Sequence, residues 1–384
     1  MNTRKSLFPL LLVVGSLCIN AQNLDRFPVI SDSSHLATAE YQTGNKYQKD
    51  AILFMEMVAN THPYYVKAER RAEWFDKKRK LLRQCKGFMS DEDFADALVA
   101  LLGSLHDKHT DLTTISRMRE RKPVPTDSIT IVNETPAPAN MQHIMRPHTS
   151  FYDYTFFPDE GICYLQFNKC VDAKDYPFTT FLNDMFDKIE ASGIKTLIVD
   201  VQYNNGGSSR LCDQLLEHLC PLNKQQPFTT FIRYSDLMTK FNPQTAKAKT
   251  AWENQGHQDE LYQAPAPQFP TDYQPPKLFE GEVVFVMGPR TFSSAGMLLT
   301  QARDYHIGTI VGTQSTFSPS HYGDVLPYRL PNTSIVGSIS SKYFVRPNVE
   351  ATNDTNLLPD HNIDLSDKDA AWQYIVGKFG KREL

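Results

Sequence analysis

The sequence predicts an α/β domain preceded by a small domain made only of helices. Between residues 46 and 118 the apolar residues recur at helical spacing. From residue 151 onward, apolar runs of strand length alternate with segments of helical spacing, which is typical of α/β layers. The 384 residues are 41% hydrophobic, enough for more than one core. The formal net charge of −4 provides no basic field, so we expect no nucleic-acid partner.

The first 21 residues are typical of an export signal. Two basic residues precede an apolar core, Leu7 to Leu17, which is shorter than a membrane span needs. Ala21 is a small residue of the kind that precedes a cleavage site, so we expect a mature chain that begins near Gln22 and is periplasmic or secreted. Cys18 could accept a lipid, but Leu17 is larger than such a site prefers, so a lipoprotein is the less favoured alternative. No later run has the length of a transmembrane segment.

Three helices are expected in the N-terminal domain, residues 46 to 118, after a polar leader of residues 22 to 45. The first should end before Pro63, because proline disfavours helical geometry in the residue that precedes it. The second should run from Ala68 to Cys85. The third should begin after Ser90, which opens a capping-box pattern, and it carries an apolar stripe.

The second domain, residues 151 to 384, follows a linker of residues 119 to 150 that is rich in Pro, Thr and Asn. A polar insertion rich in Gln and Pro covers about residues 221 to 276, and its pattern does not define its secondary structure. The apolar run at 195–201 is continuous, as in a strand buried on both faces. The expected strands are 161–167, 195–201, 283–287 and 308–312, and the expected helices are 178–192, a segment through 215–219, 294–304 and 367–379.

Cysteine and histidine spacing gives no support for a metal or another cofactor, and we expect none. The sequence has six cysteines, five of them after the export signal, and the odd number argues against a complete disulfide framework. His106 and His109 are close enough in sequence to suggest a metal site, but no third ligand lies at a matching spacing.

Two adjacent serines lie where an apolar strand meets a helix, in "RTFSSAGMLL". A serine at this place, such as Ser293, has the unpaired N–H groups and positive dipole end of the helix beside it, which favours an oxyanion during acyl transfer. The alternative is that Ser293 or Ser294 only caps the helix. The GxSxG pattern is absent, so an α/β-hydrolase is not indicated.

Two further segments could supply the rest of such a site. In "DVQYNNGGSS", Asp200 to Ser209, a buried strand runs into a glycine turn whose backbone can approach a substrate, although an ordinary turn would have the same pattern. The spacing of a dinucleotide-binding GxGxxG motif is missing. In "LHDKHTDL", His109 lies just beyond a helix, between Asp107 and Thr110, and could be a general base or a structural histidine.

Taken together, "LLGSLHDKHTDL", "KTLIVDVQYNNGGSS" and "VVFVMGPRTFSSAGMLLTQARDYHIGTIVGT" resemble the tail-specific (C-terminal processing) protease superfamily. They are most similar to its branch with tricorn-type peptidases and interphotoreceptor retinoid-binding protein repeats. The resemblance covers most of residues 45 to 365. It implies a ClpP/crotonase-like catalytic domain and an exported serine-type endopeptidase that hydrolyses a protein or peptide substrate through an acyl-enzyme. A catalytically inactive protein that binds apolar ligands or peptides on the same fold is the alternative.

The resemblance assigns the site residues. It places the nucleophile at Ser293 and the general base at His109. The backbone N–H of Ser294 would contribute to the oxyanion hole, with Gly206 or Gly207 as the other donor. We expect no metal ion at this site, because the histidine spacing offers no third ligand.

The base distinguishes the branches of the superfamily. In the processing-protease branch a lysine activates the serine, and its place in this chain falls at Ser318. No lysine lies between Arg303 and Lys342, which argues against a Ser–Lys pair. The tricorn-like branch uses a histidine from the other domain, and His109 fits that place. An imidazole also needs a smaller pKa change than an amine to serve as a base near neutrality.

Three departures from the family pattern are evident. Lys108 replaces the Gly or Ser of relatives. The acid that orients His109 is not marked by a motif, and Asp354 is the candidate, with Glu350 behind it. Residues 119 to 150 are too few for the PDZ domain that many relatives carry, so recognition of protein tails by such a domain is not expected.

Overall fold

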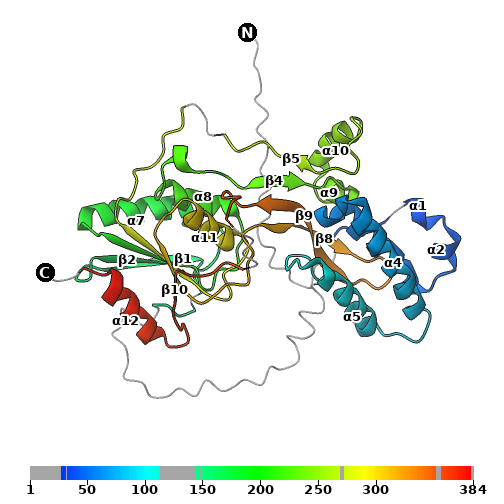
Figure 1. Ribbon diagram of the computed structural model, residues 1–384, viewed down its shortest axis with the longest axis horizontal. Helices are drawn as coiled ribbons and strands as arrows, with labels where there is room; N and C mark the ends of the chain where they lie inside the picture. Colours follow the sequence, from blue (N-terminus) through cyan, green and yellow to red (C-terminus); the bar gives the residue numbers. More distant parts are fainter. Residues whose placement is uncertain are drawn as a thin grey trace, which may run out of the picture.

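The computed structural model in Figure 1 describes most of the chain. The expected export signal, Asp354 and nearly all of the expected linker lie outside the described residues. None of the described helices has both the length and the apolar character needed to cross a membrane. The described residues are 27–31, 33–112, 144–147, 149–268, 272–351 and 356–381.

A six-stranded sheet forms the centre of the α/β part, in the order β1-β2-β3-β6-β7-β10. β1 pairs antiparallel with β2, and all the other pairs are parallel. The strand bounds are β1 Tyr152–Phe157, β2 Ile162–Phe167, β3 Thr196–Asp200, β6 Glu282–Met287, β7 Thr309–Gly312 and β10 His361–Asn362.

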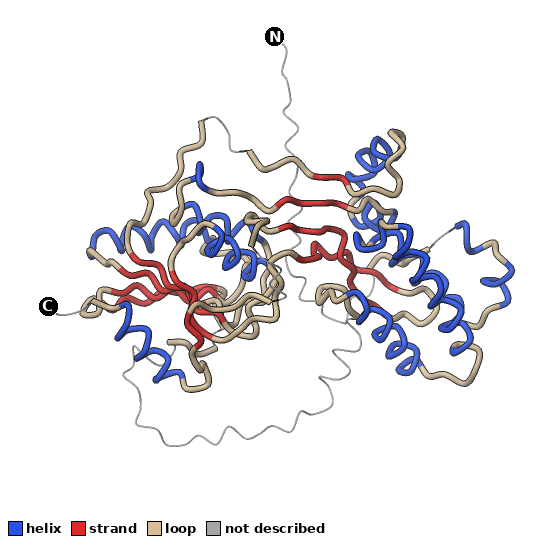
Figure 2. The backbone as a smooth tube through the Cα atoms, in the orientation of Figure 1, coloured by secondary structure: helices blue, strands red, loops and turns tan. Residues whose placement is uncertain are grey.

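Helices cover both faces of this sheet, as Figure 2 shows. Leu197 and Val199 of β3 share a core with α7, α8 and α11, whereas Ile198 faces a separate core with α12. Because successive side chains of a strand point to opposite faces, a strand covered on both sides is apolar throughout, as the sequence of β3 predicts. The helix bounds are α7 Phe178–Ser192, α8 Ser209–Glu217, α11 Ser294–Asp304 and α12 Lys368–Phe379.

The N-terminal part is helical, and its three main helices confirm the sequence prediction. α3 begins after Asn45, and α5 begins after Ser90; both residues form capping boxes. α3 ends directly before His62, the residue that precedes Pro63. The bounds are α1 Ser33–Leu36, α2 Ala39–Thr43, α3 Lys46–Thr61, η2 Pro63–Val66, α4 Ala68–Gln84, α5 Asp91–Leu102 and η3 Gly103–Leu105.

A second sheet, which the sequence analysis did not predict, joins the two parts. Its order is β5-β4-β9-β8, with every pair antiparallel. In Figure 1 it lies between the six-stranded sheet and the N-terminal helices. The bounds are β4 Thr229–Ile232, β5 Tyr262–Gln263, β8 His321–Arg329 and β9 Val336–Val345, and the polar insertion adds η4 Leu222–Lys224, α9 Asp236–Phe241, η5 Pro243–Thr245 and α10 Ala246–Glu253.

The β8–β9 hairpin belongs to the core of the N-terminal helices. Tyr328 and Ile339 share one apolar cluster with Phe54 of α3. The buried carboxylate of Asp50, also on α3, accepts hydrogen bonds from residues 332 and 333 in the hairpin turn. The β8–β9 hairpin is therefore tied to α3 both by apolar packing and by hydrogen bonds.

Candidate active site

Ser293 lies at the corner between β6 and α11 in a conformation that is unusual for a residue with a side chain. Its φ is 52° and its ψ is −126°. The preceding turn is fixed by hydrogen bonds from Thr291 Oγ1 to Val201 O (2.8 Å) and from Phe292 N to Asn204 O (3.0 Å). Ser293 occupies the N-cap position, but its side chain makes no capping hydrogen bond. The hydroxyl is thus free of the alternative role that the sequence left open.

The Gly206–Gly207 turn packs against this corner so closely that side chains are excluded. A Cβ atom on Gly206 would lie 2.6 Å from Ser293 Cβ and 3.0 Å from Ser294 N. A Cβ atom on Gly207 would lie 2.3 Å from the carbonyl oxygen of Cys170. Both glycines have positive φ, 99° and 138°, which residues with side chains rarely adopt. The backbone of this turn is therefore held directly beside the Ser293 side chain.

The N–H groups of this region are not equally available. Gly206 N donates to Asn204 Oδ1 at 2.9 Å. Within the described chain, the N–H groups of Gly207 and Ser294 donate to no acceptor. Ser294 Oγ donates to the Gly207 carbonyl at 2.7 Å, which ties the turn to the start of α11. Of the two expected glycine donors, Gly207 is thus the one that is free to bind an oxyanion.

His109 reaches this corner from the loop that follows η3. Its ring centroid lies 4.5 Å from that of Phe292, the residue before Ser293. Its Nδ1 lies 3.5 Å from Asp107 Oδ1, whereas its Nε2 is buried and has no hydrogen-bond partner in the part of the chain that the structure describes. No hydrogen bond connects Ser293 Oγ with His109 Nε2 in this structure. The structure therefore brings the two expected residues into one region, with Nε2 as the uncommitted nitrogen.

Asp107 is the carboxylate that contacts His109, and the sequence analysis had not assigned it this role. Asp107 Oδ1 also accepts the backbone N–H of His109 at 2.9 Å. Burial opposes ionisation of the Asp107 side chain, but hydrogen bonds and charge from His109 and His62 outweigh it and hold its pKa below the usual range. The candidate named from sequence, Asp354, lies outside the described residues, and Glu350 is exposed. The spacing Asp-x-His was the available signal, since Asp side chains commonly bond to the backbone two residues on.

The family of the chain follows from its sequence. Residues 161–363 match the model of peptidase family S41. The chain belongs to peptidase family S41. This confirms the expected tail-specific protease superfamily and the α/β fold class. Family membership also supports a serine peptidase, and it gives no support to the ligand-binding alternative.

Some solved structures are similar to this S41 member over most of its length. One is a candidate peptidase from Parabacteroides merdae, with a TM-score of 0.57 and 15% identity over 87% of this chain and 97% of that one. Others are a lipoprotein from Streptococcus agalactiae (TM-score 0.49, 12% identity, 87% and 97% covered) and a photosystem II D1 C-terminal processing protease (TM-score 0.48, 12% identity, 88% and 98% covered). At such low identity the P. merdae structure shows the fold alone. No curated protein sequence matches the chain.

Three further side chains, those of His106, Lys108 and His321, lie near His109 in sequence or in space and bear on which residue is the general base. His106 is exposed and has a left-handed backbone, with φ 51°. The Nζ of Lys108 is exposed and donates to Thr316 O at 3.1 Å, in the loop where the family lysine would lie. His321, which the sequence analysis missed, is buried beside His109 with 5.7 Å between ring centroids. Burial and the neighbouring charge of His109 lower the pKa of His321 to about 3, so its ring is neutral near pH 7.

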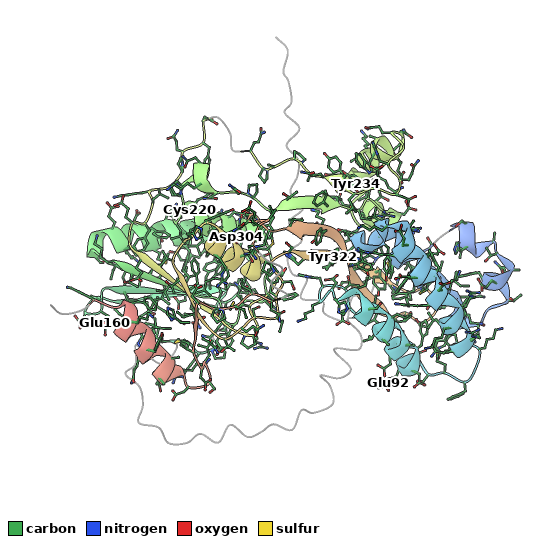
Figure 3. All side chains as sticks on the ribbon, in the orientation of Figure 1. Glu92, Glu160, Cys220, Tyr234, Asp304 and Tyr322 are labelled. Atoms are coloured by element: carbon green, nitrogen blue, oxygen red, sulfur yellow. The ribbon has the colours of Figure 1, made fainter. Side chains whose placement is uncertain are left out.

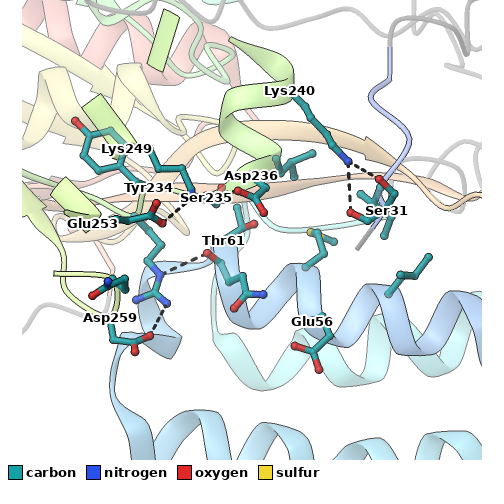
Figure 4. A pocket seen from close by; sticks show the side chains of 17 residues that line it. Ser31, Glu56, Thr61, Tyr234, Ser235, Asp236, Lys240, Lys249, Glu253 and Asp259 are labelled. Atoms are coloured by element: carbon teal, nitrogen blue, oxygen red, sulfur yellow. Dashed lines mark hydrogen bonds and ion pairs between the residues drawn. The ribbon is translucent and has the colours of Figure 1, made fainter. Parts of the chain in front are cut away.

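A separate cavity of about 250 Å³, shown in Figure 4, is distinct from this site. It is lined by α3, α9 and α10, and none of the expected catalytic residues contributes to it. Its charges are largely paired with one another, as Lys249 is with Asp236 (3.1 Å) and Glu253 (2.7 Å). Among the described residues no group of three His, Cys, Asp or Glu side chains is arranged to hold a metal ion.

Proposed function

We propose that the chain is an exported serine-type endopeptidase with a Ser293–His109–Asp107 triad. The observation that carries the proposal is the state of His109. Its Nδ1 faces an ionised, buried carboxylate, and its Nε2 is uncommitted beside the Ser293 corner. A carboxylate on one ring nitrogen fixes the proton there and leaves the other nitrogen with a lone pair, as a general base requires.

The chemistry follows from these positions. His109 Nε2 takes the proton of Ser293 Oγ as the oxygen attacks the peptide carbonyl. The negative charge of the tetrahedral intermediate is stabilised by the free N–H groups of Ser294 and Gly207. His109 then returns the proton to the leaving amine, which leaves an acyl-enzyme on Ser293. A water molecule gives its proton to His109 and its oxygen to the acyl group, and the acid product departs as Ser293 is reprotonated.

The reaction requires one change from the structure described. Ser293 Oγ and His109 must come into hydrogen-bond contact, and such contacts commonly tighten only when substrate is bound. The strained backbone of Ser293 supports a functional role, because sparsely populated conformations persist only where surrounding contacts enforce them. The hydrogen bonds around Thr291 and Phe292 provide that enforcement.

Export and the substrate class complete the proposal. The basic and apolar pattern of residues 1 to 21 supports removal of a signal peptide, with a mature periplasmic or secreted chain that begins near Gln22 and lipid attachment as the less favoured outcome. The substrate is a protein or peptide. N-terminal sequencing of exported material tests the cleavage, and a chain that still begins at Met1 would contradict it.

A fluorophosphonate probe tests the nucleophile, because it reacts with activated serines and not with capping ones. We expect the wild type to be labelled and the Ser293→Ala and His109→Ala variants to resist labelling. Ser192→Ala is the control, since Ser192 is an exposed serine at the end of α7. Labelling of Ser293→Ala at the wild-type rate would contradict the assignment.

A further inference from the structure

We propose that His62 is a positioning residue, which holds Asp107 so that one carboxylate oxygen stays directed at His109. This inference rests on the proposed Ser293–His109 mechanism. His62 Nε2 lies 3.1 Å from Asp107 Oδ2, and the two side chains are 0% and 2% exposed. The sequence analysis gave His62 no role.

The tautomer of His62 is fixed by its other nitrogen. Tyr64 N lies 3.1 Å from His62 Nδ1 and can only donate a hydrogen bond, so Nδ1 is an acceptor. The ring proton of neutral His62 is therefore on Nε2. It points at Asp107 and makes His62 a hydrogen-bond donor to the carboxylate.

The two oxygens of Asp107 have different partners. Oδ2 accepts from three donors: His62 Nε2, Thr110 Oγ1 (2.6 Å) and Ser340 Oγ (2.7 Å). Among the described residues, Oδ1 faces only His109, through its backbone N and its ring. Because three donors from three chain segments converge on Oδ2, the carboxylate cannot rotate without breaking them. Oδ1 is thereby kept opposite the imidazole.

His62 also couples this carboxylate to the scaffold. Its backbone N bonds to Val58 O at the end of α3, and its ring packs against that of Tyr322 on β8, with 4.6 Å between centroids. Tyr322 is labelled in Figure 3, where it lies at the junction of the N-terminal helices and the second sheet. The helical part and the hairpin thus both determine where Asp107 lies.

A positioning role matters at the moment when His109 becomes an imidazolium. The carboxylate must then be ionised and in place to stabilise the positive ring. A hydrogen bond to a charged group contributes enough to change a rate by about 10- to 100-fold. Loss of the His62 donor should therefore lower kcat by about that factor, without a direct effect on substrate binding.

The alternative is a purely structural role, in which His62 Nδ1 caps the first turn of η2. The two roles use different nitrogens, so two variants separate them. In His62→Asn the amide oxygen can occupy the place of Nδ1 and keep the cap on Tyr64 N, but no donor reaches Asp107. In His62→Gln the amide nitrogen can occupy the place of Nε2 and keep the donor to Asp107, but the cap is lost.

The experiment measures kcat, KM and Tm for both variants with fluorescently labelled, unstructured casein. We expect His62→Asn to keep its Tm and KM but to lose about 10- to 100-fold in kcat. We expect His62→Gln to keep kcat within a few-fold, although its Tm falls. Wild-type kcat in His62→Asn, or a kcat that follows Tm across both variants, would overturn the inference.

Two more variants complete the test. Ser340→Ala removes a second donor to Asp107 Oδ2 without a change at His62, and we expect it to lower kcat by a smaller factor at unchanged KM. If His62→Asn does not fold, wild-type kcat in Ser340→Ala overturns the inference instead.

Ser293→Ala in the same assay separates the proposed triad from the proposed positioning role of His62. If that variant hydrolyses casein normally, the triad itself is wrong, whereas an inactive Ser293→Ala with a fully active His62→Asn refutes only the positioning role.

Discussion

The ring of His109 packs against the ring of Phe292, with 4.5 Å between their centroids, and Phe292 immediately precedes Ser293. The two residues are far apart in the sequence: His109 follows the N-terminal helices, and Phe292 belongs to the α/β part. Their contact places the expected base, His109, beside the expected nucleophile, Ser293, although the two residues belong to different parts of the chain. The hydrogen bond between Ser293 Oγ and His109 Nε2 stays a prediction.

The identity of the base is tested by a pair of neighbouring variants. We expect His109→Ala to lower casein hydrolysis by roughly 10²–10⁴-fold or more, which is typical when a general base is removed. Lys108→Ala should change little, because the Lys108 amine is exposed and donates to Thr316 O rather than to the site. Ser293→Ala should lose about as much casein-hydrolysing activity as His109→Ala. The double variant should lose little more activity than either single variant, because the two residues act as a unit. Wild-type turnover in His109→Ala would remove the histidine from the mechanism.

The glycine turn beside Ser293 gives a second prediction. Gly206→Ala should abolish most activity, because the new Cβ would lie 2.6 Å from Ser293 Cβ and force the nucleophile to move. Gly193→Ala is the matched control: its φ is also positive, 66°, but nothing lies within 4 Å of the added atom. We expect that control to lose about 1 kcal/mol of stability from backbone strain and to keep its kcat. Equal activity of Gly206→Ala and Gly193→Ala would show that the close packing has no catalytic role.

Asp107 and Asp354 compete as the acid of the triad, and one substitution in each distinguishes them. Asp107→Asn should lower kcat by roughly 10²–10⁴-fold, because an amide can fix the wrong tautomer of His109. Asp354→Asn should leave kcat close to wild type. The measurement is kcat for casein, with circular dichroism to check folding. A large loss in Asp354→Asn alone would return the role to the residue named from sequence.

The sequence was sufficient to predict the elements that carry a local signal. The capping box at Ser90 and the proline at 63 each mark a helix end, and the structure has helix ends at these places. The continuous apolar run of β3 likewise marked a strand with helices on both faces. The nucleophile corner and the glycine turn were recognisable because strand, turn and helix follow one another directly.

The second sheet could not be predicted in the same way. β4 and β9 pair although they are more than 100 positions apart, and the polar insertion carries no clear alternation. The contacts of Asp107 with His62 and Ser340 are also long-range in sequence. Each of those side chains is unremarkable in its own segment, so only the fold reveals that they share a carboxylate.

The last prediction concerns stability in acid, and it follows from the burial of His321. Burial and the charge of His109 lower the pKa of His321 from its ordinary value near 6.5 to about 3. Between these values the unfolded chain binds a proton at this position and the native chain does not. Stability therefore falls as pH drops from about 6.5 to about 3, by an amount on the order of several kcal/mol.

A variant without this titration isolates the effect. His321→Asn places an amide donor near the position of Nδ1, which lies 3.2 Å from Pro319 O, and it does not titrate. The smaller side chain should destabilise the protein near pH 7, but the difference from wild type in unfolding free energy should narrow as pH falls toward 4. The unfolding free energy of His321→Asn should still fall as pH drops, because burial also lowers the pKa of His218 to about 4. Urea unfolding at pH 7, 6, 5 and 4 measures the difference in unfolding free energy.

His306→Asn is the control, since His306 is exposed and asparagine tolerates its φ of 58°. If the unfolding free energies of wild type and His321→Asn differ by the same amount at every pH from 7 to 4, His321 is not the buried neutral histidine that its contacts with Phe317 and Phe344 indicate.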